Sequence, residues 1–182
     1  MKNIKSAVLE LGETFIVSLV VILTLYAFIA SVEVVWGASM EPNFHTGERI
    51  LVEKVTKNFE KFERGDVIVF IPPGSEDKHY IKRIIGLPGE YFKILDCGVY
   101  ISKDGEKFVL QEDYLRKDTC TGGGTSIKDG RTQKIPDDSY VALGDNREYS
   151  VDSRYLGVIS KNSIIGKVVF VFWPPKDLGF VN

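Results

Sequence analysis

Hydrophobic residues gather first in one long run near the start of the chain. From Thr14 to Val32 the sequence reads TFIVSLVVILTLYAFIASV, nineteen residues without a charge. At about 1.5 Å per residue, a helix of this length comes close to the ~30 Å hydrocarbon thickness of a bilayer. The pattern predicts a transmembrane anchor over residues 14–35, after a short cytoplasmic N-terminus at residues 1–13.

A cleaved secretory signal is the alternative interpretation of this run. Such signals have apolar cores of roughly 7–15 residues before an A-x-A-like cut, and a cut after Ala30 places the bulky Phe28 at the third position back. Lys2 and Lys5 precede the run, and the first basic residue after it is Arg49. The positive-inside rule therefore favours a single-pass protein of the cell membrane with a cytoplasmic N-terminus and its remaining residues on the outer face.

Shorter apolar runs follow the predicted anchor and indicate β-strands. They are rich in β-branched residues and end at turn residues, and they read RILVEKV (49–55), DVIVFIPP (66–73), HYIKRIIGLPGE (79–90), SYVALGD (139–145) and IIGKVVFVFWPP (164–175). Trp173, Phe172 and Phe180, near the C-terminus, suit either a core or a membrane interface, where Trp is enriched.

A polar stretch interrupts this series of strands. Residues 97–136 contain DGEKF, TGGGTS and KDGRT, which are turn-rich sequences. This change predicts a small inserted lobe at 97–136, within a β core that is formed by residues 36–96 and 137–182.

The composition fits a folded and mostly β protein. Eight Tyr, eleven Phe, seventeen Gly and seven Pro favour strands and turns over a helical bundle. A formal net charge of -2 gives no reason to expect a nucleic acid partner. Cys97 and Cys120 are the only cysteines, and two histidines add too few ligands for a zinc site, so we expect no metal. The cysteines are either free thiols or one disulfide.

Ser39 lies in the segment WGASMEP, directly after the long apolar run. A serine hydroxyl is a poor nucleophile until a base removes its proton, and the usual base is a histidine oriented by a carboxylate. His45 lies in a turn-like segment too near Ser39, and His79 follows the charged turn GSEDK. Neither histidine stands among groups that would orient it, so a catalytic Ser39 needs another base.

Lys82 is the candidate for that base. A lysine has a pKa near 10.4 in water, and burial lowers this value because desolvation disfavours the ammonium form. Lys82 stands inside the apolar strand YIKRIIG, where it shares a face with Tyr80 and Ile84. The alternative is an edge-strand lysine that protects against aggregation.

A third segment, LGDNREYSVDSR at residues 143–154, is denser in hydrogen-bonding groups than a simple turn requires. On its own it could also be a solvated loop held by salt bridges. In chain order, the long apolar run, SMEP, RGDVIVF, YIKRIIGLPGE and GDNREYSVDSR resemble type I signal peptidases, the Ser-Lys proteases that remove signal peptides from exported proteins.

The resemblance covers the whole chain and implies roles for individual residues. It implies that Ser39 is the nucleophile, that Lys82 is the general base, and that the Ser150 hydroxyl hydrogen-bonds and orients the Lys82 amine. Gly144 then keeps the neighbouring backbone close. The resemblance also implies an ionic framework that holds the loop, made of Asp145, which can pair with Arg83, and of Arg147, Asp152 and Arg154.

The sequence departs from the family pattern at two positions. The serine motif usually continues Ser-Met-x-Pro-Thr, whereas Asn43 follows Pro42 here and puts a polar contact from the threonine position in doubt. Some members also carry a serine two residues before the nucleophile, where this chain has Gly37. The Ser39 N–H must then share the oxyanion hole with a donor that the sequence does not identify.

The complete expectation is a mostly β protein: a single N-terminal transmembrane helix, then an antiparallel β-sheet catalytic domain with a smaller inserted β lobe. The resemblance implies an acyl-enzyme mechanism without a cofactor, and signal peptides of exported preproteins and the lipid bilayer as partners. An extended substrate would lie beside Ile81 and Lys82 with small side chains at the first and third positions before the cut, near Met40, Tyr80 and Ile81.

Two other functions fit parts of the pattern. A specialised Ser-Lys maturation peptidase would use the same two residues on very few substrates. A non-catalytic anchored β-domain that only binds a partner would not require Ser39 at all.

Overall fold

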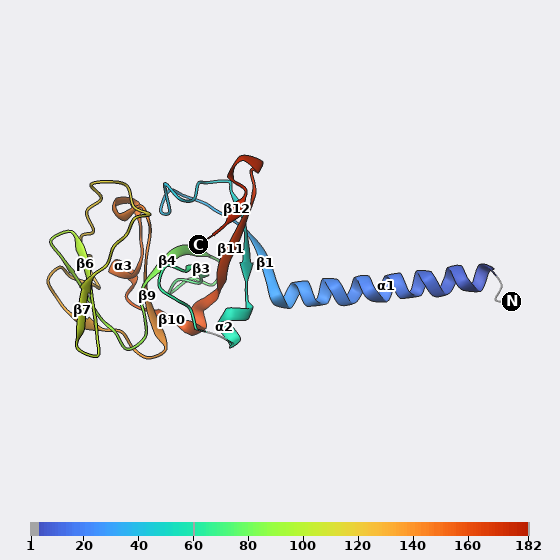
Figure 1. Ribbon diagram of the computed structural model, residues 1–182, viewed down its shortest axis with the longest axis horizontal. Helices are drawn as coiled ribbons and strands as arrows, with labels where there is room; N and C mark the ends of the chain where they lie inside the picture. Colours follow the sequence, from blue (N-terminus) through green and yellow to red (C-terminus); the bar gives the residue numbers. More distant parts are fainter. Residues whose placement is uncertain (1–3, 60, 182) are drawn as a thin grey trace.

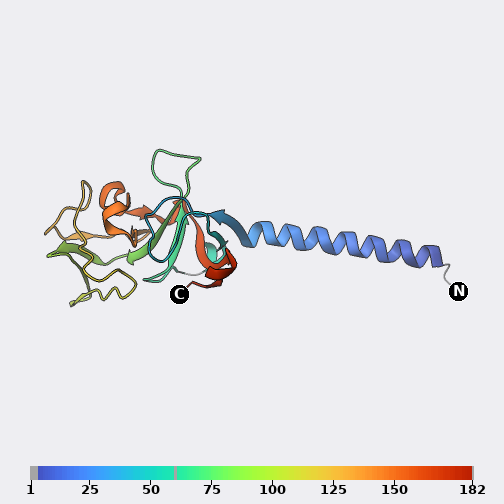
Figure 2. The ribbon, with the colours of Figure 1, turned by 90° about the horizontal axis from the view of Figure 1, so that it is seen from above.

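A computed structural model describes residues 4–59 and 61–181. It begins with helix α1 (Ile4–Ile29), which projects from a β-rich body (Figure 1). The described side chains of α1 between Val8 and Ile29 are exposed. Viewed from above, the N-terminal end of α1 lies far from the β-rich body (Figure 2).

The helix ends earlier than the predicted anchor. Residues 30–34 form strand β1 (Ala30–Val34), which pairs with β2 (Arg49–Glu53) along its whole length. The β-branched Val32 and Val34 suit a pleated strand, so pairing with β2 replaces further helix. Within the described residues, no helix combines the length and apolar character needed to cross a membrane. The predicted transmembrane helix is therefore not supported.

An eight-stranded sheet forms the body, and all its strand pairs are antiparallel, which confirms that part of the fold prediction. The order is β1-β2-β11-β3-β4-β9-β10, with β12 paired to β11. Its remaining strands are β3 (Val67–Phe70), β4 (Tyr80–Gly86), β9 (Ser139–Leu143), β10 (Ile159–Ser160), β11 (Ile164–Trp173) and β12 (Gly179–Phe180). Short helical segments connect them: α2 (Val55–Phe59), η1 (Arg147–Tyr149), α3 (Ser153–Leu156), η2 (Lys161–Ser163) and η3 (Pro175–Asp177).

A second, four-stranded sheet lies on the side of the body away from α1 (Figure 1). Its order is β7-β6-β5-β8, and its strands are β5 (Tyr91–Leu95), β6 (Gly98–Lys103), β7 (Glu106–Val109) and β8 (Gln133–Lys134). The sheet thus begins before the predicted lobe of residues 97–136. Cys97 and Cys120 form a disulfide within this region, with their Cα atoms 4.5 Å apart.

Three hydrophobic clusters fill the interior. One is formed by residues of β2, β3, β4 and β11, and it also buries Met40 and Phe44 from the segment that carries Ser39. A second joins the four-stranded sheet to β4 and β9, and a third includes other residues of β3, β4 and β9. Trp173 and Phe180 are exposed rather than part of a core.

Candidate active site

Ser39 lies on the turn between β1 and β2, residues 35–48, which we call the serine turn. Val35 N–H donates to Glu48 O at 2.9 Å and extends the pairing of the two strands up to this turn. Inside the turn, the N–H groups of Asn43 and Phe44 both donate to Met40 O at 3.0 Å. Met40 is 1% exposed and packs into the first cluster. The buried Met40 side chain therefore anchors a tight turn that leaves Ser39 at the surface of the body, partly exposed.

Lys82 lies in strand β4 and is only 3% exposed. Its Nζ atom is 2.8 Å from Ser39 Oγ and 2.7 Å from the carbonyl oxygen of Ile81. Strand β4 pairs with β3 from Tyr80 to Arg83, whereas its pairing with β9 begins only at Arg83. The edge of β4 beside Tyr80 and Ile81 is therefore unpaired where it approaches Ser39.

Burial makes the Lys82 amine easier to deprotonate. Desolvation lowers the pKa of Lys82 from 10.5 to about 8, against the opposing pull of the Asp152 and Asp145 carboxylates, and the Arg154 guanidinium assists the lowering. With such a pKa about a tenth of the amine is neutral at pH 7, enough to serve as a base.

The segment 144–154 approaches the serine turn closely at Gly144. A Cβ atom at this position would stand 2.2 Å from Ser150 Oγ and 2.5 Å from Ser39 O. Only glycine fits there without displacing one of these groups. The Ser150 hydroxyl is buried and has no hydrogen-bond partner among the described residues. The predicted bond from Ser150 to the Lys82 amine is thus absent from this structure.

Asp145 connects the segment to β4 and to the serine turn. Its carboxylate accepts two bonds from the Arg83 guanidinium, at 2.9 Å and 2.8 Å, which confirms the predicted pair. The same carboxylate accepts a bond of 2.8 Å from Asn43 Nδ2. Asn43 therefore makes a polar contact from the position where the family usually has threonine, and the doubt about that contact was unfounded.

The other framework residues hold the segment from within. Asp152 is fully buried, accepts from Gly144 N–H at 3.0 Å and pairs with Arg154 at 2.8 Å. Arg154 also donates to Arg147 O at 2.7 Å, and Arg147 Nε donates to Gly144 O at 3.1 Å. These bonds fix the backbone on both sides of Ser150.

Asn146 is a contributor that the sequence prediction missed. Its backbone N–H donates to Ser39 O at 3.0 Å, and its Nδ2 donates to Ala38 O at 3.0 Å. In the sequence Asn146 is one of many polar residues in its loop, and nothing there indicates that it faces Ser39.

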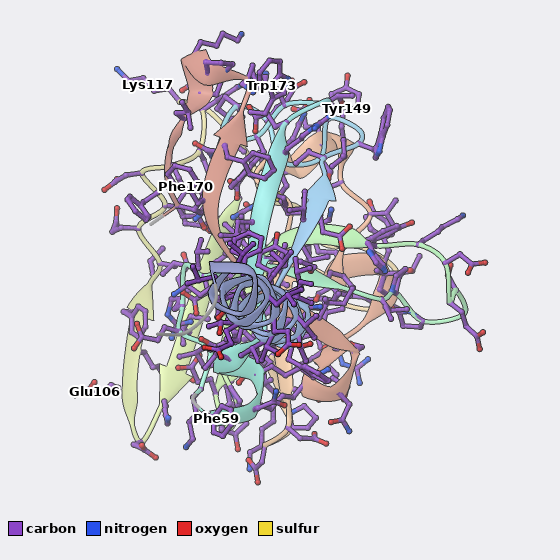
Figure 3. The ribbon with its side chains drawn as sticks, turned by 90° about the vertical axis from the view of Figure 1, so that its right-hand side faces the viewer. Phe59, Glu106, Lys117, Tyr149, Phe170 and Trp173 are labelled. Carbon is purple, nitrogen blue, oxygen red and sulfur yellow. A yellow bond between two sulfur atoms is a disulfide. The ribbon has the colours of Figure 1, made fainter. Side chains whose placement is uncertain are left out.

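A cleft of about 490 Å³ passes Ser39 and Lys82. Its lining includes β1 residues on one side, Tyr80 and Ile81 of β4 on the other, and Trp36, Tyr149 and Val151. Figure 3 shows Tyr149 at one end of the body, away from Phe59. The predicted substrate contacts Tyr80 and Ile81 thus line the cleft, whereas Met40 points into the core and does not.

Both histidines have partners away from Ser39. His79 Nδ1 is 3.1 Å from Glu33 Oε2, and His45 Nδ1 is 3.2 Å from Glu48 Oε1. Within residues 4–59 and 61–181, no group of three or more His, Cys, Asp or Glu is arranged to hold a metal ion.

Comparison with known proteins identifies the family. The family model described as "Signal peptidase, peptidase S26" matches residues 8–173. The chain belongs to this signal peptidase family. Signal peptidase I of Bacillus amyloliquefaciens is 40% identical over 178 residues, which are 96% of this chain and 92% of that protein. Signal peptidase I S of Bacillus subtilis (strain 168) is 36% identical over 183 residues, 98% of this chain and 96% of that protein.

A more distant relative is similar over less of its own length. The probable signal peptidase I-2 of Synechocystis sp. is 32% identical over 179 residues, 96% of this chain and 77% of that protein. Membership of the signal peptidase family makes this chain a serine endopeptidase, and the alternative of a non-catalytic binding domain is wrong.

Proposed function

We propose that this enzyme removes N-terminal signal peptides from exported preproteins with a Ser39–Lys82 dyad. The observation that carries the proposal is the distance of 2.8 Å between Lys82 Nζ and Ser39 Oγ, made by a lysine that is 3% exposed. Both other candidate bases, His45 and His79, are occupied with carboxylates elsewhere.

In the proposed mechanism, neutral Lys82 takes the Ser39 proton while Oγ attacks the scissile carbonyl carbon. The Ser39 N–H, which donates to no other described residue, stabilises the oxyanion. The resulting lysine ammonium gives its proton to the leaving amine, and an acyl-enzyme remains. Lys82 then takes a proton from water, hydroxide attacks the ester, and the same proton returns to Ser39 Oγ.

Gly144 and Ser150 support the dyad in this proposal. The close approach at Gly144 places the Ser150 hydroxyl beside the serine turn, and this hydroxyl is buried without a partner. A buried hydroxyl without a partner costs free energy. We therefore assign it to a bond with the Lys82 amine that forms in the substrate complex, where catalytic hydrogen bonds often tighten.

The substrate would bind as an added strand. The unpaired edges of β1 and β4 both face the cleft, and backbone pairing with an extended peptide is a common mode of recognition. Apolar lining residues such as Ile81 and Val34 would then form shallow pockets for the small side chains at the first and third positions before the cut.

The place of action would be the outer face of the cell membrane, with the bilayer as a partner. The disulfide between Cys97 and Cys120 suits a β domain outside the reducing cytosol. The exposed side chains of α1 are largely apolar, from Val8 to Ile29, and offer a surface for lipid contact.

Cleavage of a preprotein in detergent tests the proposed function. Wild type should cut after an A-x-A-like site, and both Ser39→Ala and Lys82→Ala should lose more than about a thousandfold in kcat, as removal of a nucleophile or base does. His45→Ala is the control and should stay active. Full activity in either dyad variant, with folding intact, would refute the dyad, and a panel of unrelated preproteins would separate general processing from a specialised maturation task.

A further inference from the structure

One loop of the second sheet reaches back to the candidate active site. Residues 110–121 follow β7 and contain no helix or strand; we name this segment the strap. Its first residue, Leu110, donates from its N–H to Val99 O at 2.8 Å. At the other end, Cys120 is bonded to Cys97, and Thr121 N–H donates to Cys97 O at 3.1 Å. Both ends of the strap are therefore fixed to β6 or to the turn before it.

The middle of the strap contacts the residue next to Lys82. The Tyr114 ring lies 4.3 Å from the Arg83 guanidinium, which places the cation over the ring face. Arg83 is the residue that pairs with Asp145 in two bonds. The carbonyl oxygen of Tyr114 also accepts a bond of 2.9 Å from Asn43 Nδ2, in the serine turn.

Neighbouring strap residues contact the loop that carries Ser150. Glu112 accepts from Arg147 Nη1 at 3.1 Å and from Arg147 Nη2, and it also accepts from the Tyr114 hydroxyl. Thr121 accepts a further bond from Arg147. Burial, together with the Glu112 carboxylate, raises the pKa of Tyr114, which keeps its hydroxyl protonated as a donor.

The strap also contacts the serine turn at its exposed surface, where Arg116 pairs with Glu41 at 3.4 Å. The strap thus touches the serine turn, β4 beside Lys82, and the loop of residues 144–154. Strap residues also line a second cavity of about 180 Å³, together with Asn146 and Tyr149. Figure 3 shows Lys117, a strap residue, at the same end of the body as Tyr149 and opposite Glu106.

We propose that the strap positions the Ser39–Lys82 dyad by holding Arg83, Asn43 and Arg147 together, with Tyr114 as the positioning residue and the Cys97–Cys120 disulfide as its anchor. The inference rests on the proposed function. The inference gives a positioning role to the strap, a part of the chain that lies outside the sequence motifs. Tyr114 also packs against the cluster of the second sheet, so the strap links that sheet to the dyad.

The position of the strap decides which kinetic constant should change. None of its residues lines the cleft beside Ser39 and Lys82, so substrate binding should be preserved. Tyr114→Ala should lower kcat about tenfold, the equivalent of one buried cation–aromatic contact, with KM changed less than about twofold. Tyr114→Phe keeps the ring over Arg83 and should restore most of kcat.

The pH profile separates positioning from a general loss of stability. If Arg83 is held less firmly against Asp145, this carboxylate attracts the Lys82 ammonium more strongly, because Asp145 already raises the pKa of Lys82. The ascending limb of kcat/KM should therefore move to higher pH in Tyr114→Ala. Ile101→Ala, in the buried core of the second sheet, is a stability control that should lower the melting temperature and leave this limb in place.

Two further variants complete the experiment. Asp113 is the exposed neighbour of Tyr114. The Asp113 side chain has no hydrogen-bond or ion-pair partner among the described residues, so Asp113→Ala should behave as wild type. The double variant Cys97→Ser and Cys120→Ser should resemble Tyr114→Ala. A dithiol reductant, which gives two electrons and two protons to the disulfide and is itself oxidised, should slow wild type but not the double variant.

The kcat and the pH profile of each variant are compared with those of the wild-type enzyme in detergent. Unchanged kcat and an unmoved ascending limb in Tyr114→Ala would overturn the inference, as would equal kinetic defects in Tyr114→Ala and Ile101→Ala. The proposed dyad is tested separately, because activity in Ser39→Ala or Lys82→Ala would refute it whatever the strap variants show.

Discussion

The chemistry of Lys82 depends on the balance between its burial and the two carboxylates near it. Because its pKa is lowered from 10.5 to about 8, the amine loses its proton as the pH rises through about 8. We expect kcat/KM to rise with pH to a plateau above that value. An ascending limb near pH 10 in the wild type, measured with a peptide substrate, would show that Lys82 is not the base.

Lys82→Arg belongs to the same prediction as a variant that keeps the charge. A guanidinium stays protonated near neutral pH, so it cannot accept the Ser39 proton and activity should be lost. Lys78, an exposed lysine before β4, supplies the matched control, since Lys78→Arg should leave the pH profile unchanged.

Ser150 gives a second prediction at this scale. Ser150→Ala removes a buried hydroxyl that makes no hydrogen bond in the structure, so its loss should not lower the melting temperature. If the hydroxyl orients the Lys82 amine once substrate is bound, kcat should fall by about a hundredfold, as it does when a single catalytic hydrogen bond is lost. Unaltered turnover in Ser150→Ala would remove Ser150 from the mechanism.

Single residues could be predicted where their local sequence was unusual. Lys82 stood out because it is a lysine inside an apolar strand, and Ser39 because it follows a long apolar run. The contacts of Asn146 and Tyr114 could not be predicted, since they are made with residues far away in the sequence, Asn146 with Ser39 and Tyr114 with Arg83.

Among the elements, the loop of residues 144–154 depends on one buried carboxylate. Asp152 accepts bonds from Gly144 N–H and from Arg154, whose side chain is 4% exposed. Asp152→Asn leaves the Arg154 charge buried without its partner, and such losses typically cost about 3–5 kcal/mol. A fall in the free energy of unfolding of this size, measured by denaturant titration, is expected.

The same variant should also change the pH profile. The Asp152 carboxylate raises the pKa of Lys82, so its neutralisation should lower that pKa further and move the ascending limb to lower pH. Asp177→Asn is the control, because Asp177 lies 3.9 Å from the exposed Lys176 and surface pairs contribute about 0–1 kcal/mol. An Asp152→Asn variant with the unfolding free energy and the ascending limb of the wild type would contradict both the predicted loss of stability and the predicted pH shift.

Element boundaries followed the sequence only where pattern and tertiary pairing agreed. The strands of residues 67–70, 80–86 and 139–143 lie inside the predicted apolar runs. Residues 30–34 read as part of an apolar helix, yet they form β1 because β2 pairs with them from Ala30 to Val34. That pairing partner is invisible in the run itself, so the end of α1 could not be placed from sequence.

For the molecule as a whole, two strands of the main sheet border the cleft in which we propose that a substrate lies. Strands β1 and β4 are not neighbours in the main sheet, but both line the cleft beside Ser39. Two residues that line the cleft, Glu33 of β1 and His79 just before β4, form a pair with Glu33 Oε2 3.1 Å from His79 Nδ1. The walls of the cleft are therefore tied together at this point by one exposed pair.

This tie predicts a substrate effect that depends on length. His79 precedes Lys82 by three residues, so a peptide that runs parallel to β4 reaches the pair about 10 Å, or about three residues, before the scissile bond. His79→Ala should keep kcat, because the proposed base is Lys82, and should change KM severalfold for peptides that extend past this point. Peptides truncated to about three residues before the cut should show no difference.

The test compares kcat and KM for the two peptide lengths, with His45→Ala as the control, because His45 lies outside the cleft. A collapse of kcat in His79→Ala, or equal changes in KM for long and short peptides, would show that the pair does not border the path of the substrate.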